Sequence, residues 1–472
     1  MKAADDFATG YAPEFSLDPH FQSDTGYADA FAKRFSDRVR FIPEEGRWLL
    51  FDDSRGWHRD TSSEVESMFA DYARELYRDA CQKAAGLDPS QGAKHIAAAA
   101  KLGDRRAMVP ALALAQTNRL LVVKLAELDA DPLLLGVRNG VVDLRDGSFH
   151  QHDPEVFVTR SAACDFVPGA QCPTFNQAVE KFQPDPEMRD YLQRLFGYSL
   201  TGLIGEHILP FHYGTGGNGK GTILEQVIFK ILGEYAVKLT DGLVYVSKHG
   251  KTPELELAGL VGKRFALGEE NDDGGFLNEK LLKGLSGGDR MKGRFHYQDF
   301  FEFDPTTKIH LVGNHRPKIS GRDDGIWRRF RLVDWPVRIP KEEQDFQFWE
   351  KLKPEFPGVL NWLIAGAVNL GKRGTLPPDS VLASTSKYRE DCDTFGEFLR
   401  EKTIPDPTST LSKFELFELY KDWCDDQEIT ERYRYSKRKV GFLMVERGYD
   451  EKKIAKGGRV WAGLRRNNSP GE

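Results

Sequence analysis

A glycine-rich stretch, FHYGTGGNGKGTILEQVIF from Phe211 onward, constrains the fold of this chain more than any other feature. Residues Gly214 to Lys220 fit the pattern G-x-x-x-x-G-K, between the apolar segment ILPFHY and the helical pattern TILEQVIFKIL. In that strand–loop–helix context, glycines let backbone N–H groups turn inward around phosphate oxygens, and the helix N-terminus favours negative charge. We therefore predict a phosphate-binding loop in which Lys220 reaches the β- and γ-phosphates of a nucleotide.

The predicted ATP-binding loop departs from the usual pattern at one position. Gly221 stands where a hydroxyl normally holds Mg²⁺, and Thr222 is the next residue. Either a local shift presents the Thr222 hydroxyl to the metal, or water and a second acidic site hold it. The predicted nucleotide contacts are Gly214, Thr215, Gly216, Gly217, Asn218, Gly219, Lys220, Gly221 and Thr222.

Polar side chains that follow two further apolar strands complete the predicted site. Glu269 and Glu270 come after the strand predicted at 264–268, where one carboxylate can engage Mg²⁺ and the other can orient water. Glu269 is the predicted metal ligand. Asn314 follows the strand predicted at 308–313, and its neutral amide can reach the γ-phosphate or its water without adding repulsive charge.

Three arginines lie on and before the strand predicted at 329–335. By alternation, Arg329 and Arg331 share one face and Arg328 takes the other. They are either surface charges or the source of an arginine finger that reaches into a neighbouring subunit's site. The residues alone leave both interpretations open.

With 472 residues, the chain has room for two to four domains. In its middle part, apolar strands alternate with helices, which is typical of an α/β sheet. Upstream, a helix from Ala28, strands carrying Trp48 and Trp57, a helical region from Ser62 to about Leu128 and two short strands predict an α+β domain. The predicted boundaries are a flexible tail at 1–22, the N-terminal α+β domain at 23–173, the ATPase domain at 174–340, a helical lid and linker at 341–385, and a winged-helix domain at 386–472.

The winged-helix prediction comes from three helical stretches followed by a strand pair around Gly457 and Gly458. From Glu431 to Glu472, twelve Lys or Arg stand against five Asp or Glu, a local net charge of about +7. This basic surface either faces duplex DNA or is a solvated or subunit-contact face. The predicted DNA contacts in this part are Lys437, Arg438, Lys439 and Arg459.

Bulk charge and composition bear on whether the protein binds nucleic acid, spans a membrane, is secreted or holds zinc. Because the net charge is −6, any nucleic-acid surface has to be local. No apolar run reaches about eighteen residues, so a membrane span is not expected. The N-terminal sequence lacks the apolar stretch of a signal peptide, which predicts a cytoplasmic protein. The five cysteines are scattered with no CxxC pair, which favours reduced structural thiols over a zinc site.

Several segments occur here in a characteristic order: GTGGNGKG, ALGEE, EKLLKGLSGGDRMKGRFHYQDFFEFDPTTKIHLVGN and GIWRRF. This order resembles superfamily 3 helicases, specifically the helicase half of the phage and plasmid primase-helicases related to the poxvirus primase-helicase. The upstream segments GRWLLFDDSRGWHRD, VRNGVVDLRDGSFHQHDPEVFVTR and CPTFNQAVEKF look like the domain that precedes the ATPase in that family. The resemblance covers most of the chain.

The resemblance implies an AAA+ type P-loop ATPase core, a ring of about six subunits, and translocation along DNA in the 3′ to 5′ direction. It assigns Lys220 to the Walker A loop, and Glu269 and Glu270 to Walker B. Asn314 matches the sensor. Arg328 is the better match for the family's arginine finger, with Arg329 close behind.

Between Walker B and the sensor, the family has a DNA-contacting hairpin, which RMKGRFHYQDFFEF resembles here. The resemblance implies DNA contacts by Lys283, Lys292, Arg294 and His296. Cations beside aromatic residues can pair with phosphates and pack on bases, and a ring focuses the charges of all its subunits in one channel. From the residues alone, a plain β-hairpin with a solvated basic face is the alternative.

Two features depart from the family pattern. Gly221 replaces the usual hydroxyl, and there is hardly room for an N-terminal primase domain before the α+β domain. Asp129 and Asp131 resemble a metal-binding pair, but they precede NGVVDL as in the helicase-side domain, and we interpret them as structural.

We therefore expect an ATP- and Mg²⁺-dependent DNA helicase that serves replication of a phage, plasmid or other mobile element in the cytoplasm of a bacterial host. Its expected partners are single-stranded and duplex DNA, further copies of itself, and a separate primase or polymerase. Two alternatives stay open: an origin-melting or loading factor that does not unwind processively, and a DNA-binding regulator that does not hydrolyse ATP. A small-molecule kinase explains neither the hairpin nor the basic C-terminus.

Overall fold

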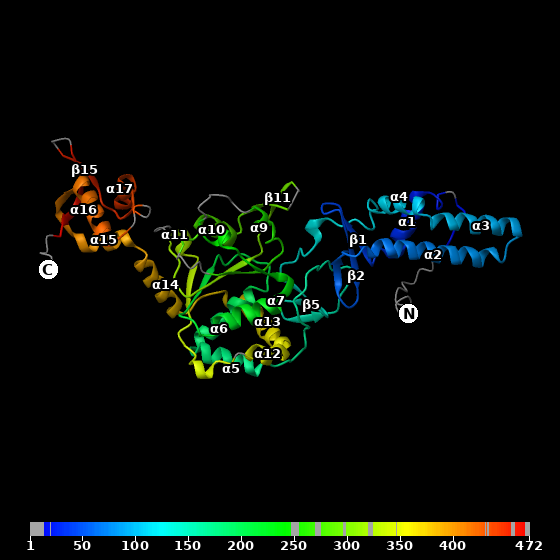
Figure 1. The fold of residues 1–472 in the computed structure, drawn as a ribbon, viewed down its shortest axis with the longest axis horizontal. Helices are drawn as coiled ribbons and strands as arrows, with labels where there is room; N and C mark the ends of the chain where they lie inside the picture. The colour runs from blue at the N-terminus through cyan, green and yellow to red at the C-terminus, as the bar shows by residue number, and fades with distance from the viewer. Residues whose placement is uncertain are drawn as a thin grey trace. The chain divides into compact units, whose positions relative to one another are not determined.

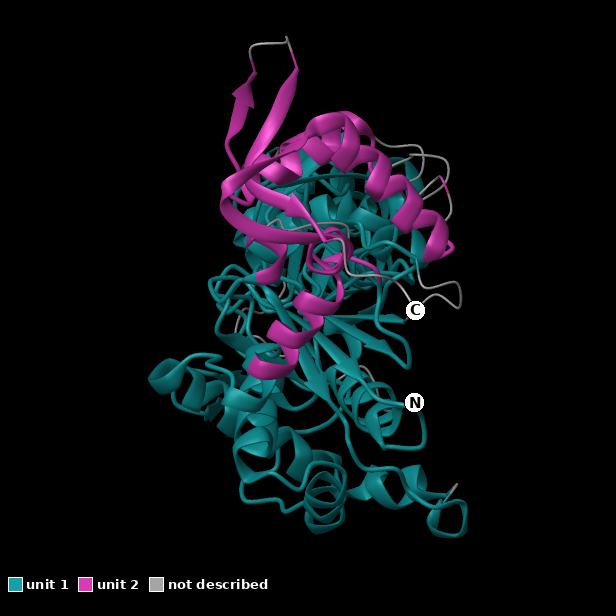
Figure 2. Cartoon of the chain, turned by 90° about the vertical axis from the view of Figure 1, so that its left-hand side faces the viewer, with its two compact units in different colours: residues 1–317, 328–382 teal, residues 318–327, 383–472 magenta. Residues whose placement is uncertain are grey.

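The computed structural model divides into two compact units, and Figure 1 follows the chain through them. Unit 1 comprises Met1–Pro317 and Arg328–Leu382, and unit 2 comprises Lys318–Trp327 and Ala383–Glu472, as Figure 2 shows. The residues described are 14–18, 20–246, 254–269, 275–295, 299–319, 324–345, 347–429, 431, 434–454 and 458–467.

The N-terminal part of unit 1 combines a small antiparallel sheet with a helical layer. Apolar residues recur every three or four positions along the longest helix, so one helical face is buried. On that face, the rings of Phe69 and Tyr72 contact those of Tyr27 and Phe31. The elements are α1 (Asp24–Phe35), β1 (Val39–Ile42), β2 (Arg47–Asp52), β3 (Gly56–Arg59), α2 (Glu64–Ala84), α3 (Pro89–Leu102) and α4 (Arg105–Ala115).

Two sequence-based boundaries differ from the structure in this part. Phe15, which lies in the tail predicted at 1–22, is buried, and its N–H donates to Asp79 Oδ2 at 2.6 Å. The long helical region predicted to reach Leu128 ends at α4. After α4 the chain forms turns up to Leu121, and Val122 then bridges in parallel to Phe41 on β1, whose N–H donates to the Leu121 carbonyl. This tertiary pairing overrides the local helical pattern, apart from one short 3₁₀ turn, η1 (Leu125–Glu127).

A second antiparallel sheet follows, of which the sequence pattern predicted only the last two strands. Asp129 accepts hydrogen bonds from the Thr159 N–H and hydroxyl at 2.8 and 2.6 Å, and Asp131 forms an ion pair with Arg145 at 2.9 Å. Both carboxylates therefore hold the chain around this sheet. The elements are β4 (Leu134–Val137), β5 (Gly140–Asp143), β6 (Ser148–His150), α5 (Pro173–Phe182) and α6 (Pro186–Tyr198).

The centre of unit 1 is a five-stranded sheet in the order β13-β7-β12-β9-β8, with every neighbouring pair parallel. Parallel neighbours require crossovers, so helical segments lie between the strands in sequence. Four of the strands lie where the sequence predicted them, and β8 was missed because it is only three residues long. The strands are β7 (Leu209–Tyr213), β8 (Ala236–Lys238), β9 (Phe265–Glu269), β12 (Lys308–Gly313) and β13 (Phe330–Asp334).

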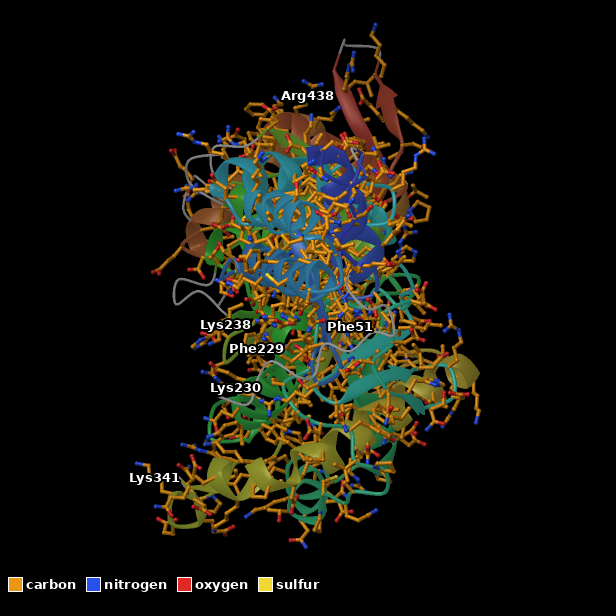
Figure 3. The ribbon with its side chains drawn as sticks, turned by 90° about the vertical axis from the view of Figure 1, so that its right-hand side faces the viewer. Phe51, Phe229, Lys230, Lys238, Lys341 and Arg438 are labelled. Atoms are coloured by element: carbon orange, nitrogen blue, oxygen red, sulfur yellow. The ribbon has the colours of Figure 1, made fainter. Side chains whose placement is uncertain are left out.

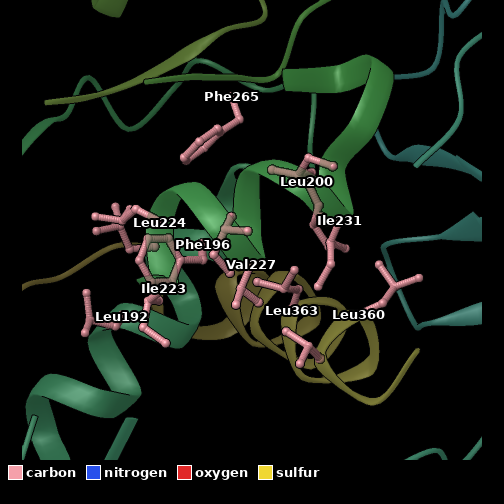
Figure 4. Close-up of a cluster of buried hydrophobic side chains, with 14 of the residues drawn as sticks. Leu192, Phe196, Leu200, Ile223, Leu224, Val227, Ile231, Phe265, Leu360 and Leu363 are labelled. Atoms are coloured by element: carbon pink, nitrogen blue, oxygen red, sulfur yellow. The ribbon is translucent and has the colours of Figure 1, made fainter. Parts of the chain in front are cut away.

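The helix that follows the glycine-rich loop is anchored by a continuous apolar core (Figure 4). Ile223, Leu224, Val227 and Ile231 are each 1% exposed or less and belong to the same buried cluster as residues of α6 and of the long helix after β13. Burial of a side chain of this size stabilises the fold by about 1.5–3 kcal/mol. The loop therefore ends on a rigid helix, η2 (Thr222–Ile228, π-helical) continued by α7 (Phe229–Leu232).

A chain of buried hydrogen bonds links side chains on β7 and β12 with one residue directly after β13 and one directly after α6. Trp335 Nε1–H donates to His212 Nδ1 at 3.2 Å, so the hydrogen of His212 lies on Nε2. That nitrogen is 3.1 Å from His310 Nδ1, and His310 Nε2 is 2.9 Å from Ser199 Oγ. Every donor in this chain thus meets an acceptor only while both imidazoles are neutral. Burial, followed by the charge of Lys220, lowers the pKa of His212 to about 3.

The remaining elements of unit 1 flank the sheet or cover the loop. Gly293 on β10 lies so close to Ala258 that a Cβ there would be 3.1 Å from its backbone, so the β10–β11 hairpin packs against α9. These elements are η3 (Gly233–Tyr235), α8 (Asp241–Val244), α9 (Glu254–Ala258), α10 (Glu279–Gly287), β10 (Met291–Arg294), β11 (Phe300–Phe303), η4 (Lys341–Glu343), α12 (Phe348–Leu352), η5 (Lys353–Glu355) and α13 (Phe356–Arg373).

Unit 2 has the element order helix, strand, helix, helix, strand, strand, with two more helices earlier in the chain. Its core packs Trp423 and Trp461 among phenylalanine and leucine side chains. Inside the segment predicted as helical lid and linker at 341–385, a helix begins at Asp379, directly after Pro377 and Pro378, and the boundary between the two units falls after Leu382. The elements are α11 (Asp324–Trp327), α14 (Asp379–Asp391), α15 (Thr394–Lys402), β14 (Thr403–Ser412), α16 (Lys413–Asp426), α17 (Lys437–Glu446), β15 (Glu451–Lys453) and β16 (Arg459–Arg466). Among the described residues, no helix combines the length and apolar character needed to cross a bilayer.

The buried histidines predict a pH dependence of stability. Because burial lowers the pKa of His212 and His310, the unfolded chain binds protons below about pH 6.5 that the folded chain excludes. Stability is therefore expected to fall as the pH falls below that value, by about 1.4 kcal/mol per pH unit for each histidine. Thermal unfolding midpoints measured from pH 7.5 to 5 should show the decline.

The matched control separates this effect from general acid sensitivity. The thermal unfolding midpoint of a His212→Gln/His310→Gln chain should fall less steeply with falling pH than that of the natural chain, although it is lower at pH 7.5. His150→Gln, which alters an exposed histidine, should keep the natural slope. Equal slopes in all three chains would contradict the assignment to the buried pair.

Candidate functional site

The predicted site residues converge at the C-terminal edge of the parallel sheet. Gly214 begins the loop directly after β7, and Asn314 directly follows β12. Glu269 ends β9, in register with Val312, which is itself in register with His212. The loop, the amide and the carboxylate therefore lie along one edge, which is where α/β sheets bind their ligands.

The loop backbone depends on glycine at several positions. Gly216, Gly217 and Gly219 have φ of 91°, 61° and 82°, a region that other residues seldom adopt. A Cβ at Gly219 would also be 2.3 Å from the Phe182 ring. The Gly217 carbonyl accepts the Ile339 N–H at 2.7 Å, so the segment after β13 helps to hold the loop in place.

Lys220 is held in place at the centre of this edge. Its side chain is 7% exposed, and Nζ donates to the Gly214 carbonyl at 2.9 Å and to Asn314 Oδ1 at 2.6 Å. The structure thus brings together two residues that lie 94 positions apart and that the sequence assigned to one site. These two hydrogen bonds fix the ammonium group beside the loop, where it can meet an anion.

Gly221 differs from the other loop glycines. It is exposed, its φ is negative, and a Cβ placed on it would meet no atom within 4 Å. Neither backbone conformation nor packing therefore requires glycine at this position. Thr222, the alternative hydroxyl, lines a cavity on the side of the loop where Phe182 lies.

That cavity, beside the glycine-rich loop, has a volume of about 420 Å³, within the range of small-ligand sites of about 300–1,000 Å³. Its walls come from α5, from the loop and the helix after it, and from the segment after β13. Lys181 and Glu343 form an ion pair at 2.6 Å between two of these walls. The lining residues are Thr174, Gln177, Ala178, Lys181, Phe182, Gly217, Gly219, Thr222, Gln226, Ile339, Glu343, Gln344, Asp345, Phe348 and Trp349.

The acidic position at the end of β9 is occupied by an ion pair. Glu269 Oε1 is 3.0 Å from Lys238 Nζ, and the same ammonium also binds Glu225 on the helix after the loop. The hydrogen bonds that Lys238 donates to Glu225, and then to Glu269, raise the pKa of Lys238. Lys238, labelled in Figure 3, is a residue that sequence reasoning missed, because β8 itself was not predicted. The predicted partner Glu270 lies outside the described residues.

The two arginine-finger candidates occupy different environments. Arg328 is exposed, and its carbonyl accepts a hydrogen bond from the side chain of Arg331 at 2.8 Å. Arg329 is half-buried, and its Nη2 would be 3.2 Å from a Cβ on Gly287, at the end of α10. Exposure therefore favours Arg328 over Arg329 as the arginine that a second subunit can meet.

The predicted DNA hairpin is an antiparallel pair, β10 and β11. Lys292 and Arg294 are exposed and both lie over the ring of Phe300, at 5.8 and 5.0 Å. Phe300 is itself 51% exposed. Lys283 is half-buried on the preceding helix α10, and His296 lies outside the described residues.

In unit 2, the predicted DNA contacts lie at the start of α17 and on β16. Ser436 caps α17, and the next three residues, Lys437, Arg438 and Lys439, are all exposed (Arg438 is labelled in Figure 3). Arg459 is also exposed, and it forms an ion pair at 2.7 Å with Glu451, which also pairs with Lys413.

Comparison with known families and proteins gives two matching models. Residues 28–184 match the model described as "D5 N terminal like", and residues 212–329 match a family of unknown function. A "Putative helicase" of Acanthamoeba polyphaga mimivirus is 26% identical over 322 residues, covering 63% of this chain and 34% of that protein. A "Putative helicase" of Frog virus 3 is 25% identical, covering 63% and 39%.

A "Putative primase" of African swine fever virus is 23% identical over 337 residues, covering 63% of this chain and 34% of that protein. This chain thus spans little more than a third of these viral relatives. Among solved structures, the apo NrS-1 C terminal region aligns over 90% of this chain and 96% of that chain, at 10% identity and a TM-score of 0.47.

The contrast between two loop glycines generates a prediction about stability. Gly219→Ala should lower the thermal midpoint, because its φ is positive and its Cβ would collide with Phe182; a loss of about 1–3 kcal/mol is expected. Gly221→Ala, two positions away, should change stability by less than about 0.5 kcal/mol. Equal losses of stability in the two variants would show that the positive φ of Gly219 and its contact with Phe182 do not constrain the loop.

Proposed function

Because these matches support a member of the primase-helicase family, we propose that the chain is an ATP-dependent DNA helicase that works in replication. The observation that carries the proposal is the hydrogen bond between Lys220 and Asn314 beside a loop whose glycines adopt positive φ. A lysine held in this way reaches the terminal phosphates of a nucleotide, and an amide beside it can polarise the attacking water.

In this proposal the nucleotide lies along the loop. Its phosphates accept hydrogen bonds from the backbone N–H groups of residues 214–221, and its base and ribose enter the neighbouring cavity. Phe348 and Trp349 offer apolar surface there, and Thr222 lines the wall nearest the loop. The cavity separates the base from water, which favours a bound over a free nucleotide.

Hydrolysis then depends on groups at the edge of the sheet. Lys220 stabilises charge that develops on the γ-phosphate, and Asn314 orients the attacking water. Arg328 of a neighbouring subunit adds a second positive charge from outside. The exposed carboxylate of Glu269 and the hydroxyl of Thr222, which follows the loop, fit a hard cation, and Mg²⁺ would neutralise charge on the β- and γ-phosphates when bound.

DNA contact is proposed at two surfaces. The hairpin cations Lys292 and Arg294 lie beside an exposed phenylalanine, a combination suited to single-stranded backbone and bases. The element order of unit 2 fits a winged helix, with α17 as the recognition helix. We further propose an AAA+ type ring of about six subunits that moves 3′ to 5′ on a phage, plasmid or viral replication template.

The first test of the proposal uses complementation between inactive subunits. Lys220→Ala and Arg328→Ala should each lower DNA-stimulated ATP turnover by about 10³-fold or more, because one removes the loop cation and the other the finger. Mixed in equal amounts, they should recover activity, since roughly a quarter of the interfaces in a head-to-tail ring pair an intact loop with an intact finger. Turnover is measured by phosphate release.

Arg119→Ala, which alters an exposed arginine far from the loop in sequence, serves as the control and should keep full turnover. Failure of the mixture to recover would argue against a finger shared between subunits. If the natural chain shows no turnover at any DNA concentration, the helicase proposal fails in favour of a DNA-binding regulator. Turnover without unwinding of tailed duplexes would favour an origin-melting or loading factor.

The hairpin makes a separate prediction about DNA. A Lys292→Ala/Arg294→Ala chain should bind single-stranded DNA about 10-fold or more weakly, and its logarithmic salt dependence should fall by about 0.7 for each lost phosphate contact. Lys230→Ala/Lys341→Ala removes two exposed lysines elsewhere (Figure 3) and should leave binding unchanged. Equal losses in the two double variants would indicate a diffuse charge effect instead of a hairpin contact.

A further inference from the structure

A second cavity, of about 560 Å³, lies in unit 1 away from the glycine-rich loop. The turn between β2 and β3, the strand β4, the segment 158–163 and the turn at 233–234 form its walls. Trp57, Val137, Val158 and Ala162 supply apolar surface. Its volume falls within the range of about 300–1,000 Å³ that small ligands occupy.

The charge of this cavity is its distinctive property. Three arginines line it, Arg55, Arg138 and Arg160, and none of them forms an ion pair with any residue that the structure describes. The arginines Arg59 and Arg145 in the same part of the chain are paired, with Glu45 and Asp131 respectively. Three guanidinium groups thus line one concave surface, and an anion bound there would meet positive charge from all of them.

The single carboxylate in the cavity does not neutralise these arginines. Glu234 Oε2 accepts the Ser161 N–H at 2.8 Å. Arg160 donates one Nη2 hydrogen to the Val261 carbonyl at 2.8 Å, while its buried Nε–H has no hydrogen-bond partner among the described residues. A buried donor without a partner costs about 1–3 kcal/mol, and this one lies against Gly262, where a Cβ would be 2.4 Å from Nε.

Two histidines also line the cavity. His58 Nδ1 is 3.1 Å from the Gly56 carbonyl, and His152 Nε2 is 3.2 Å from the Arg138 carbonyl. Each carbonyl can only accept, so each of these nitrogens carries the hydrogen, and the second nitrogen of each neutral imidazole is an acceptor. That nitrogen donates to an anion only after it takes up a proton.

The walls of this cavity are rigidly connected to the helix that begins at the glycine-rich loop. Ala163 N–H donates to the Ile231 carbonyl at 2.8 Å, and Glu234 N–H donates to the Ser161 carbonyl at 3.2 Å. Tyr235, directly after Glu234, donates its hydroxyl hydrogen to the Arg160 carbonyl at 3.0 Å. These hydrogen bonds fix the backbone that forms the walls, so the shape of the cavity does not depend on a loop alone.

We propose that this cavity is a second anion site, which binds the phosphate of a nucleotide unit. Guanidinium groups bind phosphate in bidentate fashion, and the apolar wall accommodates the attached sugar or base. The phosphate comes from a free nucleotide or from the 5′ end of a single strand, which share this chemistry. The site is independent of the proposed ATPase, since none of its lining residues belongs to the glycine-rich loop.

The test uses the full chain carrying Lys220→Ala, so that the glycine-rich loop no longer contributes tight binding. Two probes are titrated by fluorescence anisotropy: an N-methylanthraniloyl derivative of ATP, and a 5′-phosphorylated oligothymidylate labelled at its 3′ end. Arg138→Glu, added to this chain, should weaken binding of one of the probes about 10-fold or more. Arg119→Glu makes the same charge change at an exposed position outside the cavity and should not.

The outcomes separate the sources of the phosphate. Selective loss with the ATP derivative identifies a free nucleotide, and selective loss with the oligonucleotide identifies a strand end. Arg55→Glu, on the opposite wall, should reproduce the effect of Arg138→Glu. If neither probe binds, or if the cavity variants and Arg119→Glu lose affinity equally, the second site does not exist. Both arginines are exposed, so unchanged thermal midpoints are expected and confirm that folding is intact.

Discussion

The arrangement of this molecule depends on holding one ammonium group, that of Lys220, at the buried edge of the central sheet. Its hydrogen bonds to the Gly214 carbonyl and to Asn314 Oδ1 fix its position. An ammonium group held in this way is suited to a charge-assisted hydrogen bond with phosphate. Only a sheet in which β12 lies directly beside β7 can bring Asn314 to this position. The strand order is therefore a condition of the site.

The histidines below the loop follow from the same constraint. His212 lies on the loop strand itself, and both burial and the nearby Lys220 lower its pKa. A neutral His212 accepts from Trp335 and donates to His310, so the hydrogen bonds tie three strands together without adding a charge beneath the lysine. A protonated imidazole there would repel the ammonium and weaken the phosphate site. The neutral state of His212 and His310 and the positive charge of Lys220 therefore favour each other.

Local patterns predicted the loop and four of the five central strands, because each has a strong periodicity or glycine signal, and the family resemblance implied the hairpin. Local patterns failed where tertiary contacts decide. The chain after α4 leaves the helical pattern and bridges to Phe41 at Val122, and Lys238 enters the site from a three-residue strand with no pattern of its own. The cavity beside the loop was also missed, since Phe182 and Trp349 are distant in sequence and look like ordinary core residues. Glu270 and His296 lie outside the described residues and stay predictions.

The ion pair of Glu269 with Lys238 shapes how the acidic position can work. While paired, the carboxylate has Oε1 turned toward an ammonium, which leaves its other oxygen to accept from water or meet a cation. The cost of releasing it is small, because both side chains are about half exposed, and pairs of this kind contribute about 0–1 kcal/mol. Lys238 keeps a second partner, Glu225, on the helix that starts at the loop. Exchange of Glu269 from Lys238 to a ligand therefore leaves no isolated charge, so the resting pair and an active carboxylate are compatible in one site.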